Sequence, residues 1–330
     1  MAEHKKDGKC KALIVSGCLA HRYHDEIEKE IPEVDALLGT ASYDKIAEVV
    51  LSVLEGKGYS CIDDADRLVM TKDERITTTG GYYEYLKIAE GCDKHCTYCI
   101  IPKVRGNYRS YPMEYLVKQA EQLAEKGVKE LILVAQETTV YGVDIYGKKM
   151  LAELVKKLAA IKDIAWIRIL YCYPEEIDDA LIEVIKNEPK VCHYLDMPIQ
   201  HASDSILKKM GRRTTKQELK DVINKLRENI PDIALRTTLI TGFPGETQKD
   251  HEEMLDFVDE MEFDRLGVFT YSPEEDTPAA VMPDQIDEEV KEQRRDAVME
   301  LQQEVSLDKS EEMVGKVIDC LIEGKIEDDD

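Results

Sequence analysis

The sequence predicts an α/β protein built around a parallel sheet, and three observations lead to this fold class. Strand-like and helix-like segments alternate from residue 85 to residue 272, which is typical of repeated βα units. Continuous apolar runs such as 131–134 suit strands that are buried on both faces. Polar and sulfur-bearing motifs follow several of these strands, and the carboxyl ends of parallel strands are where ligands bind.

The predicted strands share a high content of β-branched, aliphatic and aromatic residues. They are 85–90, 129–136, 166–171, 193–199, 234–241 and 265–272. Between them, apolar residues recur at helical spacing and predict amphipathic helices. These helices are 113–126, 149–162, 176–187, 216–229 and 247–261.

A smaller α/β domain is predicted over residues 1–60, before the repeated units begin. Its expected strands and helices alternate at 11–18, 20–30, 34–39 and 42–54. Residues 61–80 are charged, end near a Thr-Thr-Thr-Gly-Gly run, and predict a linker.

The last part of the chain predicts one long helix and one strand. A charged helix is expected at about 285–310, and residues 314–325 alternate like a β-strand before an acidic end. One strand cannot make a domain by itself.

Composition indicates a folded protein of a reducing compartment. The chain has 330 residues, 43% of them hydrophobic, which is enough for about two domains with cores. No apolar run approaches the length of a membrane span, and the start lacks a signal-peptide pattern. Nine cysteines without a paired framework fit reduced thiols, so we expect a cytoplasmic protein with no membrane partner.

The charge balance favours a basic partner over nucleic acid. There are 68 acidic against 44 basic residues, a net charge of −24. Nucleic-acid binding rests on Lys and Arg neutralising phosphates, so nucleic acid is an unlikely direct substrate. Such a surface attracts basic macromolecules, although it also serves solubility alone.

Three cysteines within eight residues, Cys92, Cys96 and Cys99, are the strongest chemical signal in the sequence. They follow the strand predicted at 85–90, and thiolates are soft ligands for zinc or iron–sulfur clusters. Three thiolates, rather than four, would hold a [4Fe–4S] cluster and leave one iron open. An open iron can bind a substrate or cofactor.

Two other interpretations of the three cysteines stay open from the residues alone. A zinc knuckle needs four ligands, and His95 is poorly placed to be the fourth. Buried core thiols are also common, but the neighbouring Asp93, Lys94 and His95 make a core strand a poor fit.

The spacing Cys92-x-x-x-Cys96-x-x-Cys99, with an aromatic residue before the third cysteine, resembles the signature of the radical S-adenosylmethionine (SAM) superfamily. Further stretches resemble the methylthiotransferase family within it, in the branch that modifies an aspartate of ribosomal protein S-twelve. These stretches are 89–92, 134–142, 197–203 and 240–247.

The resemblance implies a partial (β/α)6 barrel and an enzyme. SAM would bind the open iron, and one electron would cleave it to a 5′-deoxyadenosyl radical. The implied reaction attaches a methylthio group to the β-carbon of the aspartate, with a reducing electron donor as a further partner. The alternatives are methylthiolation of adenosine in transfer RNA and, in another class, a non-catalytic iron–sulfur or zinc-binding protein.

The family also implies identities for the predicted domains. Residues 1–60 would be part of an N-terminal methylthiotransferase domain, and 61–80 a linker. Residues 81–308 would form the radical SAM core, and 309–330 the truncated start of the β-barrel called TRAM. On this resemblance the chain is expected to be a fragment, or a reading frame with a misassigned start.

Several residues are candidates for contacting SAM or substrate. Most lie at strand ends of the implied barrel, whereas Tyr98 resembles a family aromatic that packs near the adenine and Arg236 is a charge inside an otherwise apolar strand. They are Tyr98, Gln136, Glu137, Gln200, His201, Arg236, Gly242 and Gly245. Five of them have a structural alternative: a core aromatic for Tyr98, a satisfied buried residue for His201, an ion pair for Arg236 and a simple turn for the two glycines.

Cys18 is the remaining candidate metal ligand. A cysteine that ends an apolar strand is usually core, but 15–23 resembles the family segment that carries the last of three ligands of a second [4Fe–4S] cluster. Cys10 and Cys61 do not match that motif. The second cluster is therefore expected to be incompletely ligated here, which puts sulfur insertion by this chain in doubt. The remaining cysteines, Cys172, Cys192 and Cys320, are interpreted as core thiols.

Overall fold

The computed structural model describes residues 2–71 and 75–324, which divide into two compact units. Unit 1 comprises 1–74, 90–94 and 100–109, and unit 2 comprises 75–89, 95–99 and 110–330. The chain therefore passes between the units several times around the three-cysteine loop, with Cys92 in unit 1 and Cys96 and Cys99 in unit 2.

Unit 2 contains a six-stranded sheet in which every pairing is parallel. The spatial order β10-β9-β8-β7-β6-β3 follows the chain, with β3 and β10 at the edges. This confirms the predicted α/β fold and its run of βα units. The strands are β3 (Tyr83–Lys87), β6 (Glu130–Val134), β7 (Trp166–Ile169), β8 (Val191–Asp196), β9 (Ala234–Thr241) and β10 (Arg265–Thr270).

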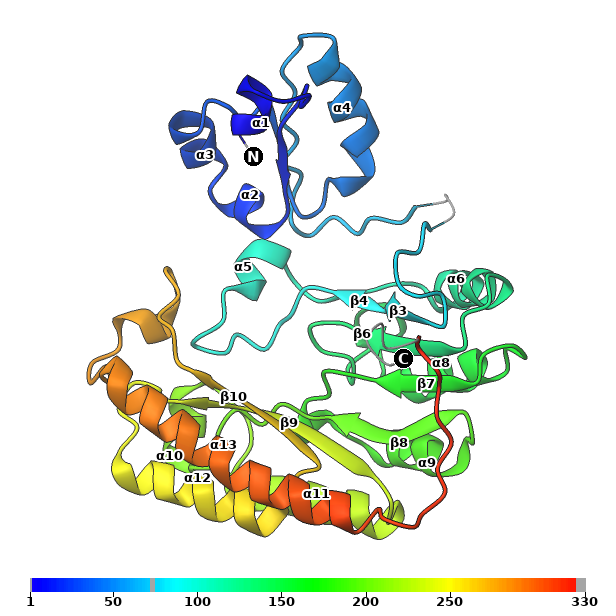
Figure 1. Cartoon of the computed structure of the whole chain (residues 1–330), viewed down its shortest axis with the longest axis vertical. Coiled ribbons are helices and arrows are strands. Elements are labelled where there is room, and N and C mark those ends of the chain that lie inside the picture. The colour runs from blue at the N-terminus through cyan, green and yellow to red at the C-terminus, as the bar shows by residue number, and fades with distance from the viewer. Residues whose placement is uncertain (1, 72–74, 325–330) are drawn as a thin grey trace, which may run out of the picture. The chain divides into compact units, whose positions relative to one another are not determined.

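Amphipathic helices cover the outer face of this sheet (Figure 1). Most of them carry a buried apolar stripe, such as Leu154, Val155 and Leu158 of α8, whereas the buried face of α13 is mainly polar. The opposite faces are charged. The main helices are α6 (Met113–Glu125), α8 (Leu151–Ala159), α9 (Asp179–Asn187), α10 (Asp204–Lys209), α11 (Lys216–Asn229), α12 (Gln248–Met261) and α13 (Glu288–Glu311).

Several predicted strands, but not the one at 234–241, end slightly too late, and this matters for the candidate residues. The strands predicted at 129–136 and 193–199 end at Val134 and Asp196. Gln136, Glu137 and Gln200 therefore lie in the loops beyond the carboxyl ends, where polar side chains are not needed for the sheet core.

Two short strands lie beside the three-cysteine loop. Strand β4 (Ala89–Glu90) pairs with β5 (Arg109–Ser110), and α5 (Ile101–Arg105) lies between them in the chain. Further short helical segments occur in the loops of unit 2. They are α7 (Val143–Tyr146), η2 (Pro174–Glu176) and η3 (Pro278–Val281).

Unit 1 is a small α/β unit around the parallel pair β1 (Ile14–Ser16) and β2 (Ala36–Leu38). The helix predicted at 20–30 is interrupted at Tyr23, where a non-helical backbone separates α2 (Cys18–Arg22) from α3 (His24–Glu30). The other helical segments are α1 (Glu3–Lys6), η1 (Tyr43–Lys45) and α4 (Ile46–Leu54).

The predicted linker at 61–80 begins as part of unit 1. Cys61 bridges to Leu38 in parallel register and joins the small core of Ala36, Leu38 and Val49. Val69 is also buried, so apolar side chains hold this segment in the unit.

The strand predicted at 314–325 is corrected by the structure. After α13 the described residues 312–324 contain no strand, and Val317 is 99% exposed. Alternating apolar and polar residues do not form a strand unless a neighbouring strand provides backbone hydrogen bonds. Residues 325–330 lie outside the described part, as does the end of that predicted strand. Within the described ranges, no helix combines the length and apolar composition needed to cross a lipid bilayer.

Candidate functional site

The loop that carries Cys96 and Cys99 is held against the end of α10 in unit 2. The Thr97 amide donates to the Met210 carbonyl at 3.0 Å, and the Thr97 hydroxyl donates to the Lys209 carbonyl at 2.8 Å. The Cys99 amide donates to the Cys96 carbonyl at 3.0 Å, which closes a tight turn between the two thiols. Backbone bonds therefore fix this part of the loop.

Aromatic hydroxyls and a cation surround the buried Cys96 thiol. The Tyr173 hydroxyl lies 3.5 Å from Cys96 Sγ, and the Tyr98 hydroxyl is also within hydrogen-bonding range of Cys96. Burial, followed by the nearby Cys96 thiol, raises the pKa of both tyrosines. Arg212 lies against Tyr173, with its guanidinium carbon 4.0 Å from the ring centroid.

Cys92 is held by backbone contacts within unit 1. Its amide donates to the Gly106 carbonyl at 3.2 Å, and its side chain is buried. The preceding Gly91 has φ +79°, and a Cβ there would lie 2.1 Å from the Asn107 carbonyl oxygen. Only glycine allows the two backbone segments to approach this closely.

Cys18 begins α2 and lies within hydrogen-bonding range of Arg105, also in unit 1. The Arg105 guanidinium donates to Glu90 at 3.0 Å. Burial would lower the pKa of Arg105, but Glu90 and then Cys18 more than compensate, so the net shift is upward. Cys18 thus lies beside the guanidinium of Arg105.

The chemistry of the cysteines fits a metal cluster. All nine cysteines lie outside disulfide bonds, including Cys92, Cys96 and Cys99. Within residues 2–71 and 75–324, no three Cys, His, Asp or Glu side chains are already gathered as a metal site. The fit therefore rests on three soft thiol donors in one loop and on the polar groups around Cys96. The interpretation of Cys320 as a core thiol is wrong, since its side chain is exposed.

The loop after β6 brings two candidate residues to the carboxyl edge of the sheet. The Gln136 amide oxygen is buried and has no hydrogen-bond partner among the described residues. Glu137 is almost fully buried and accepts from the Thr139 amide at 2.9 Å, so it stabilises its own loop. After β8, Gln200 has φ +73°, and its backbone bonds to Thr238 and Ile240 continue the pairing with β9.

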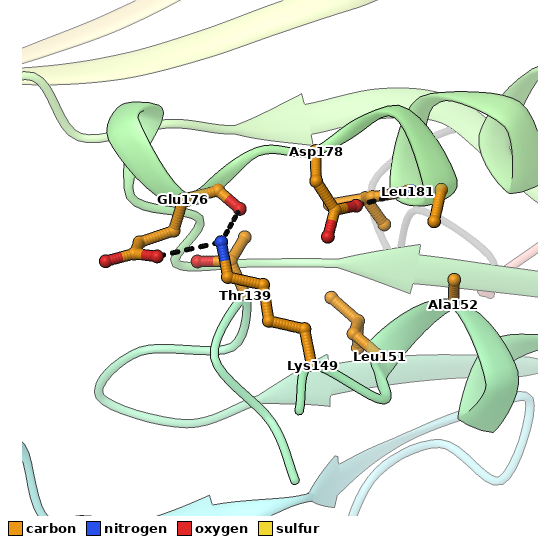
Figure 2. Close-up of a pocket in the computed structure, with 8 residues that line it drawn as sticks. Thr139, Lys149, Leu151, Ala152, Glu176, Asp178 and Leu181 are labelled. Atoms are coloured by element: carbon orange, nitrogen blue, oxygen red, sulfur yellow. Dashed lines mark hydrogen bonds and ion pairs between the residues drawn. The ribbon is translucent and has the colours of Figure 1, made fainter. Parts of the chain in front are cut away.

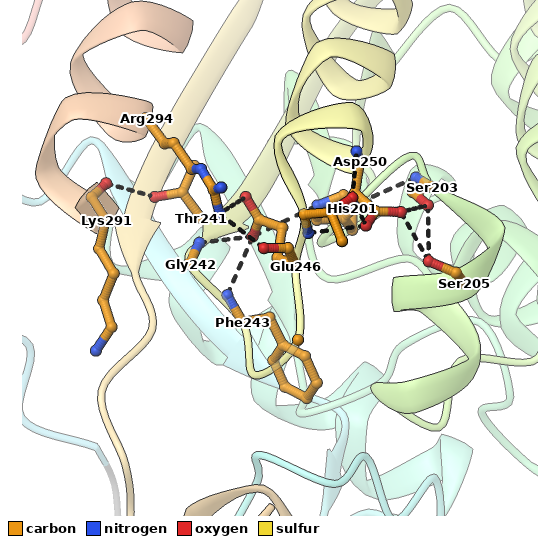
Figure 3. Close-up of polar contacts among 12 residues, drawn as sticks. His201, Ser203, Ser205, Thr241, Gly242, Phe243, Glu246, Asp250, Lys291 and Arg294 are labelled. Carbon is orange, nitrogen blue, oxygen red and sulfur yellow. Dashed lines mark hydrogen bonds and ion pairs between the residues drawn. The ribbon is translucent and has the colours of Figure 1, made fainter. Parts of the chain in front are cut away.

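The turn at 242–246 is organised by Glu246, whose carboxylate points back into the turn (Figure 3). Its Oε2 accepts from the Gly242 and Phe243 amides at 2.6 and 3.0 Å. Its Oε1 accepts from Arg294 of α13 at 3.1 Å. Gly242, at φ +72°, has no room for a side chain, because a Cβ would lie 2.1 Å from Lys291 Cγ.

His201 is fully buried behind this turn rather than exposed beside it. Its Nδ1 accepts from the Ser203 amide at 2.9 Å, and its Nε2 lies 3.7 Å from Glu246 (Figure 3). Ser203 in turn donates to Asp250 at 2.5 Å. Burial would raise the pKa of Asp250, but hydrogen bonds from Ser203 and Thr247 hold it well below its usual range.

Arg236 has its anionic partner within the protein. Its Nη1 lies 2.6 Å from the buried Asp196 carboxylate, and Asp196 also accepts from the Tyr171 amide at 3.1 Å. Burial would lower the pKa of Arg236, but the bond to Asp196 offsets this and the net shift is upward. The structure therefore favours the ion-pair alternative for Arg236.

A small recess lies between the loops that follow β6 and β7 (Figure 2). Lys149 Nζ donates to the carbonyl and the carboxylate of Glu176, both at 2.8 Å. Asp178 accepts from the Leu181 amide at 2.9 Å and caps α9. These contacts join neighbouring loops, and the recess offers no unpartnered charge for a ligand.

Comparison with known proteins places this arrangement in a family. The model of the radical SAM superfamily matches residues 86–258, just over half of the chain. A protein of Lachnoclostridium phytofermentans named "Ribosomal protein uS12 methylthiotransferase RimO" is 64% identical over 329 residues, which cover 100% of this chain and 75% of the relative. The chain belongs to the RimO family of the radical SAM superfamily.

A second RimO relative agrees with this assignment, and two solved structures share the fold. The Clostridioides difficile protein of the same name is 52% identical over 99% of this chain and 74% of its own length. The radical SAM methyltransferase TsrM of Kitasatospora setae matches with a TM-score of 0.56 at 14% identity, covering 84% of this chain and 66% of its own. The cobalamin-dependent enzyme OxsB matches with a TM-score of 0.55 at 15% identity, covering 93% and 45%. The solved structures support the fold alone.

Four residues of the site in this RimO family member escaped the sequence analysis. They are Tyr173, Asp196, Arg212 and Glu246. Tyr173 and Asp196 lie at or just beyond the ends of β7 and β8, so the same position rule that selected Gln136 could have found them. No sequence signal identifies Arg212, because its neighbour Arg213 is chemically identical but exposed.

Proposed function

We propose that the chain is a methylthiotransferase that binds SAM and a [4Fe–4S] cluster and modifies an aspartate β-carbon of ribosomal protein uS12. The observation that carries this proposal is a loop with three cysteines that form no disulfide, Cys92, Cys96 and Cys99. In the chain, this loop lies between the first strand of a six-stranded parallel sheet and its first long helix. The RimO relatives carry the same function in their names.

In this proposal the three cysteines would hold the cluster, which when bound supplies the electron that cleaves SAM. Gln136 would accept a hydrogen bond from SAM or substrate, because its buried amide oxygen lacks a partner among the described residues. Tyr98 packs edge-on against Phe243, with centroids 6.4 Å apart, and would bring the cysteine loop and the turn at 242–246 to the same ligand.

The remaining candidates divide into ligand-facing and supporting groups. Gly242 and Gly245 would let the backbone approach SAM, because both have positive φ and neither carries a side chain. Gln200 would present its side chain at the carboxyl edge of β8. Glu137, His201 and Arg236 would support loops, since each has an internal structural contact.

A basic protein substrate fits the charge of the chain better than RNA. The net charge of −24 would attract a basic ribosomal protein and repel a phosphate backbone. Methylthiolation of adenosine in transfer RNA is the second candidate function. We place the reaction in the cytoplasm, with a reducing electron donor, and propose that 309–330 is the start of a TRAM domain and 1–60 part of the N-terminal methylthiotransferase domain.

A second cluster would need more ligands than Cys18 supplies in unit 1. We therefore propose that this chain takes up about one [4Fe–4S] cluster, or ~4 iron, after anaerobic reconstitution. A chain with ~8 iron would contradict the proposal. A Cys18→Ala variant should keep the iron content of the parent, and a Cys96→Ala variant should lose most of it.

The enzyme proposal is tested by anaerobic incubation of the reconstituted chain with SAM and a strong reductant. Formation of 5′-deoxyadenosine is expected, with loss of the product in Cys96→Ala. Absence of product from a fully loaded chain would support a non-catalytic iron–sulfur or zinc protein instead.

Substrate choice is tested by adding uS12 or transfer RNA to the same reaction. Mass spectrometry should detect modification of a uS12 aspartate, and binding of uS12 should weaken as salt screens the acidic surface. Tighter binding of transfer RNA than of uS12 at physiological salt would favour the second candidate function.

A further inference from the structure

Arg212 is a buried cation that has no role in the methylthiotransferase reaction proposed above. It lies between α10 and α11, and its side chain has 0% exposure. Burying a guanidinium costs several kcal/mol unless acceptors surround it. The partners of Arg212 therefore indicate what this charge is for.

The described protein supplies only part of what the Arg212 guanidinium needs. Its Nη2 donates to the Pro198 carbonyl at 3.1 Å and lies 3.9 Å from Glu175 Oε2. Its Nε and Nη1 have no hydrogen-bond acceptor in the described part of the chain, although both are buried. Buried donors normally have acceptors, so the described protein compensates the charge of this guanidinium only in part.

The position of Arg212 relates it to Cys96. Its guanidinium stacks on the Tyr173 ring, with the carbon 4.0 Å from the centroid, and the Tyr173 hydroxyl lies 3.5 Å from Cys96 Sγ. Cation, aromatic ring, hydroxyl and thiol are thus arranged in series within unit 2. All of them are at least partly buried. Water screens charges only weakly in such surroundings, so the Arg212 charge can act on Cys96.

We propose that Arg212, together with Tyr173, sets the reduction potential of the cluster that Cys96 would hold. A cluster gains one negative charge when it takes up an electron, so a nearby cation and a hydroxyl donor at the sulfur stabilise the reduced form. Arg212 is a positioning residue in this scheme, because it acts through Tyr173 and Cys96. The inference rests on the proposed function, since it requires a cluster at Cys96.

The test compares Arg212→Met with Arg213→Met in the anaerobically reconstituted chain. Both changes remove one arginine, but Arg213 is exposed, so it controls for the loss of general charge. Redox titration followed by EPR, without SAM, gives the ratio of reduced to oxidised cluster at a fixed potential. Arg212→Met should lower this ratio about tenfold, equivalent to ~59 mV for one electron, whereas Arg213→Met should leave it unchanged.

Two more variants separate charge from packing. Arg212→Lys should keep the ratio near that of the parent, and Tyr173→Phe should lower it by a smaller factor because only the hydroxyl is lost. An unchanged ratio in Arg212→Met with full iron content would overturn the proposal. A change confined to SAM affinity, or an equal shift in Arg213→Met, would also overturn it.

Failure of the cluster to form has two distinguishable meanings. If Arg212→Met loses iron, the comparison is made between Arg212→Gln and Arg212→Lys instead. Equal ratios of reduced to oxidised cluster in these two variants would refute the charge effect. If the unmodified chain itself binds no cluster, the proposed function fails rather than this inference alone.

Discussion

Glu246 is the residue on which the turn at 242–246 depends most directly. One carboxylate oxygen accepts two backbone amides and the other accepts Arg294, while the side chain has no exposed surface. Charge-assisted bonds to a buried carboxylate are strong, but they leave a large penalty when one partner is removed.

Replacing Glu246 by glutamine should therefore destabilise the protein. The amide group would direct N–H donors toward either the backbone amides or Arg294, leaving buried donors unpaired. We expect the free energy of unfolding to fall by about 3 kcal/mol, measured by urea denaturation. Glu252→Gln, on the exposed face of α12, makes the same chemical change and should alter stability by less than about 0.5 kcal/mol. Equal losses in the two variants would contradict the assignment.

His251 gives unit 2 a specific dependence on pH. Burial lowers the pKa of His251 below 6.5; Glu246 counteracts this, while Arg294 and His201 reinforce it. In the unfolded chain His251 takes up a proton near pH 6.5, whereas in the folded chain it does so only at lower pH. The free energy of unfolding should therefore fall as the pH drops below 6.5. Above 6.5 this histidine should contribute no slope.

The size of the effect is limited to about 1.4 kcal/mol per pH unit for one proton. His251→Gln should flatten the loss of stability between pH 6.5 and pH 5.5, measured by urea unfolding at each pH. His4→Gln, which changes an exposed histidine of unit 1, should leave the profile intact. A parent-like slope in His251→Gln would show that another group is responsible.

At the scale of elements, α13 supports the turn between β9 and α12. Its Lys291 packs over Gly242 and donates to the Tyr271 carbonyl at 2.9 Å, and the Lys291 carbonyl accepts from Thr241 at 3.2 Å. With Arg294, one face of this helix contacts most of the turn.

Gly242→Ala should test how tightly α13 is packed against the turn. A methyl group at φ +72° would be strained and would collide with the Lys291 side chain. We expect a loss of about 2 kcal/mol in unfolding free energy and weaker SAM binding by equilibrium dialysis. Gly267→Ala in β10 is the control, because a Cβ there meets nothing within 4 Å. Wild-type stability in Gly242→Ala would mean that the turn can move away from α13.

The helices and strands of unit 2 could be predicted because the residue pattern within each segment is enough to identify it. Apolar residues at helical spacing and continuous apolar strands are enough to locate α6, α8, α9, α11 and α12, each to within a few residues. The predicted strand at 314–325 shows the limit of local information, since a strand also needs a partner.

The site was only partly predictable, because its contacts join distant residues. Cys92, Cys96 and Cys99 share one short loop and are visible as a spacing. The contact of Arg294 with Glu246 spans 48 residues, and that of Tyr173 with Cys96 spans 77. Neither pair leaves a periodic signal, so the internal partners of Glu246 and Cys96 emerge only from the fold.

At the scale of the whole molecule, the described residues after α13 differ from the folded part before them. Helix α13 contributes buried residues such as Val298 and Val305, whereas residues 312–324 form neither helix nor strand and are largely exposed. Exposed segments without regular hydrogen bonding are preferred sites of proteolysis.

Limited digestion with trypsin should therefore cut after Lys316 before it cuts after Lys291. Lys316 is exposed and follows α13, while Lys291 is only 5% exposed within it. Mass spectrometry should find an early product that ends at Lys316 and keeps all of α13. Early cleavage at Lys291 would show that the helix does not protect its own backbone.

The bond between Arg294 and Glu246 has a consequence for how such a protein can be divided. The superfamily match ends at residue 258, yet the cation that neutralises Glu246 lies 36 residues further on. A fragment trimmed to the recognised domain would retain every motif by which the family is identified. It would nevertheless leave the buried Glu246 carboxylate without its cation at the carboxyl edge of the sheet. The smallest fragment that folds stably should therefore extend beyond the matched range 86–258 and include Arg294.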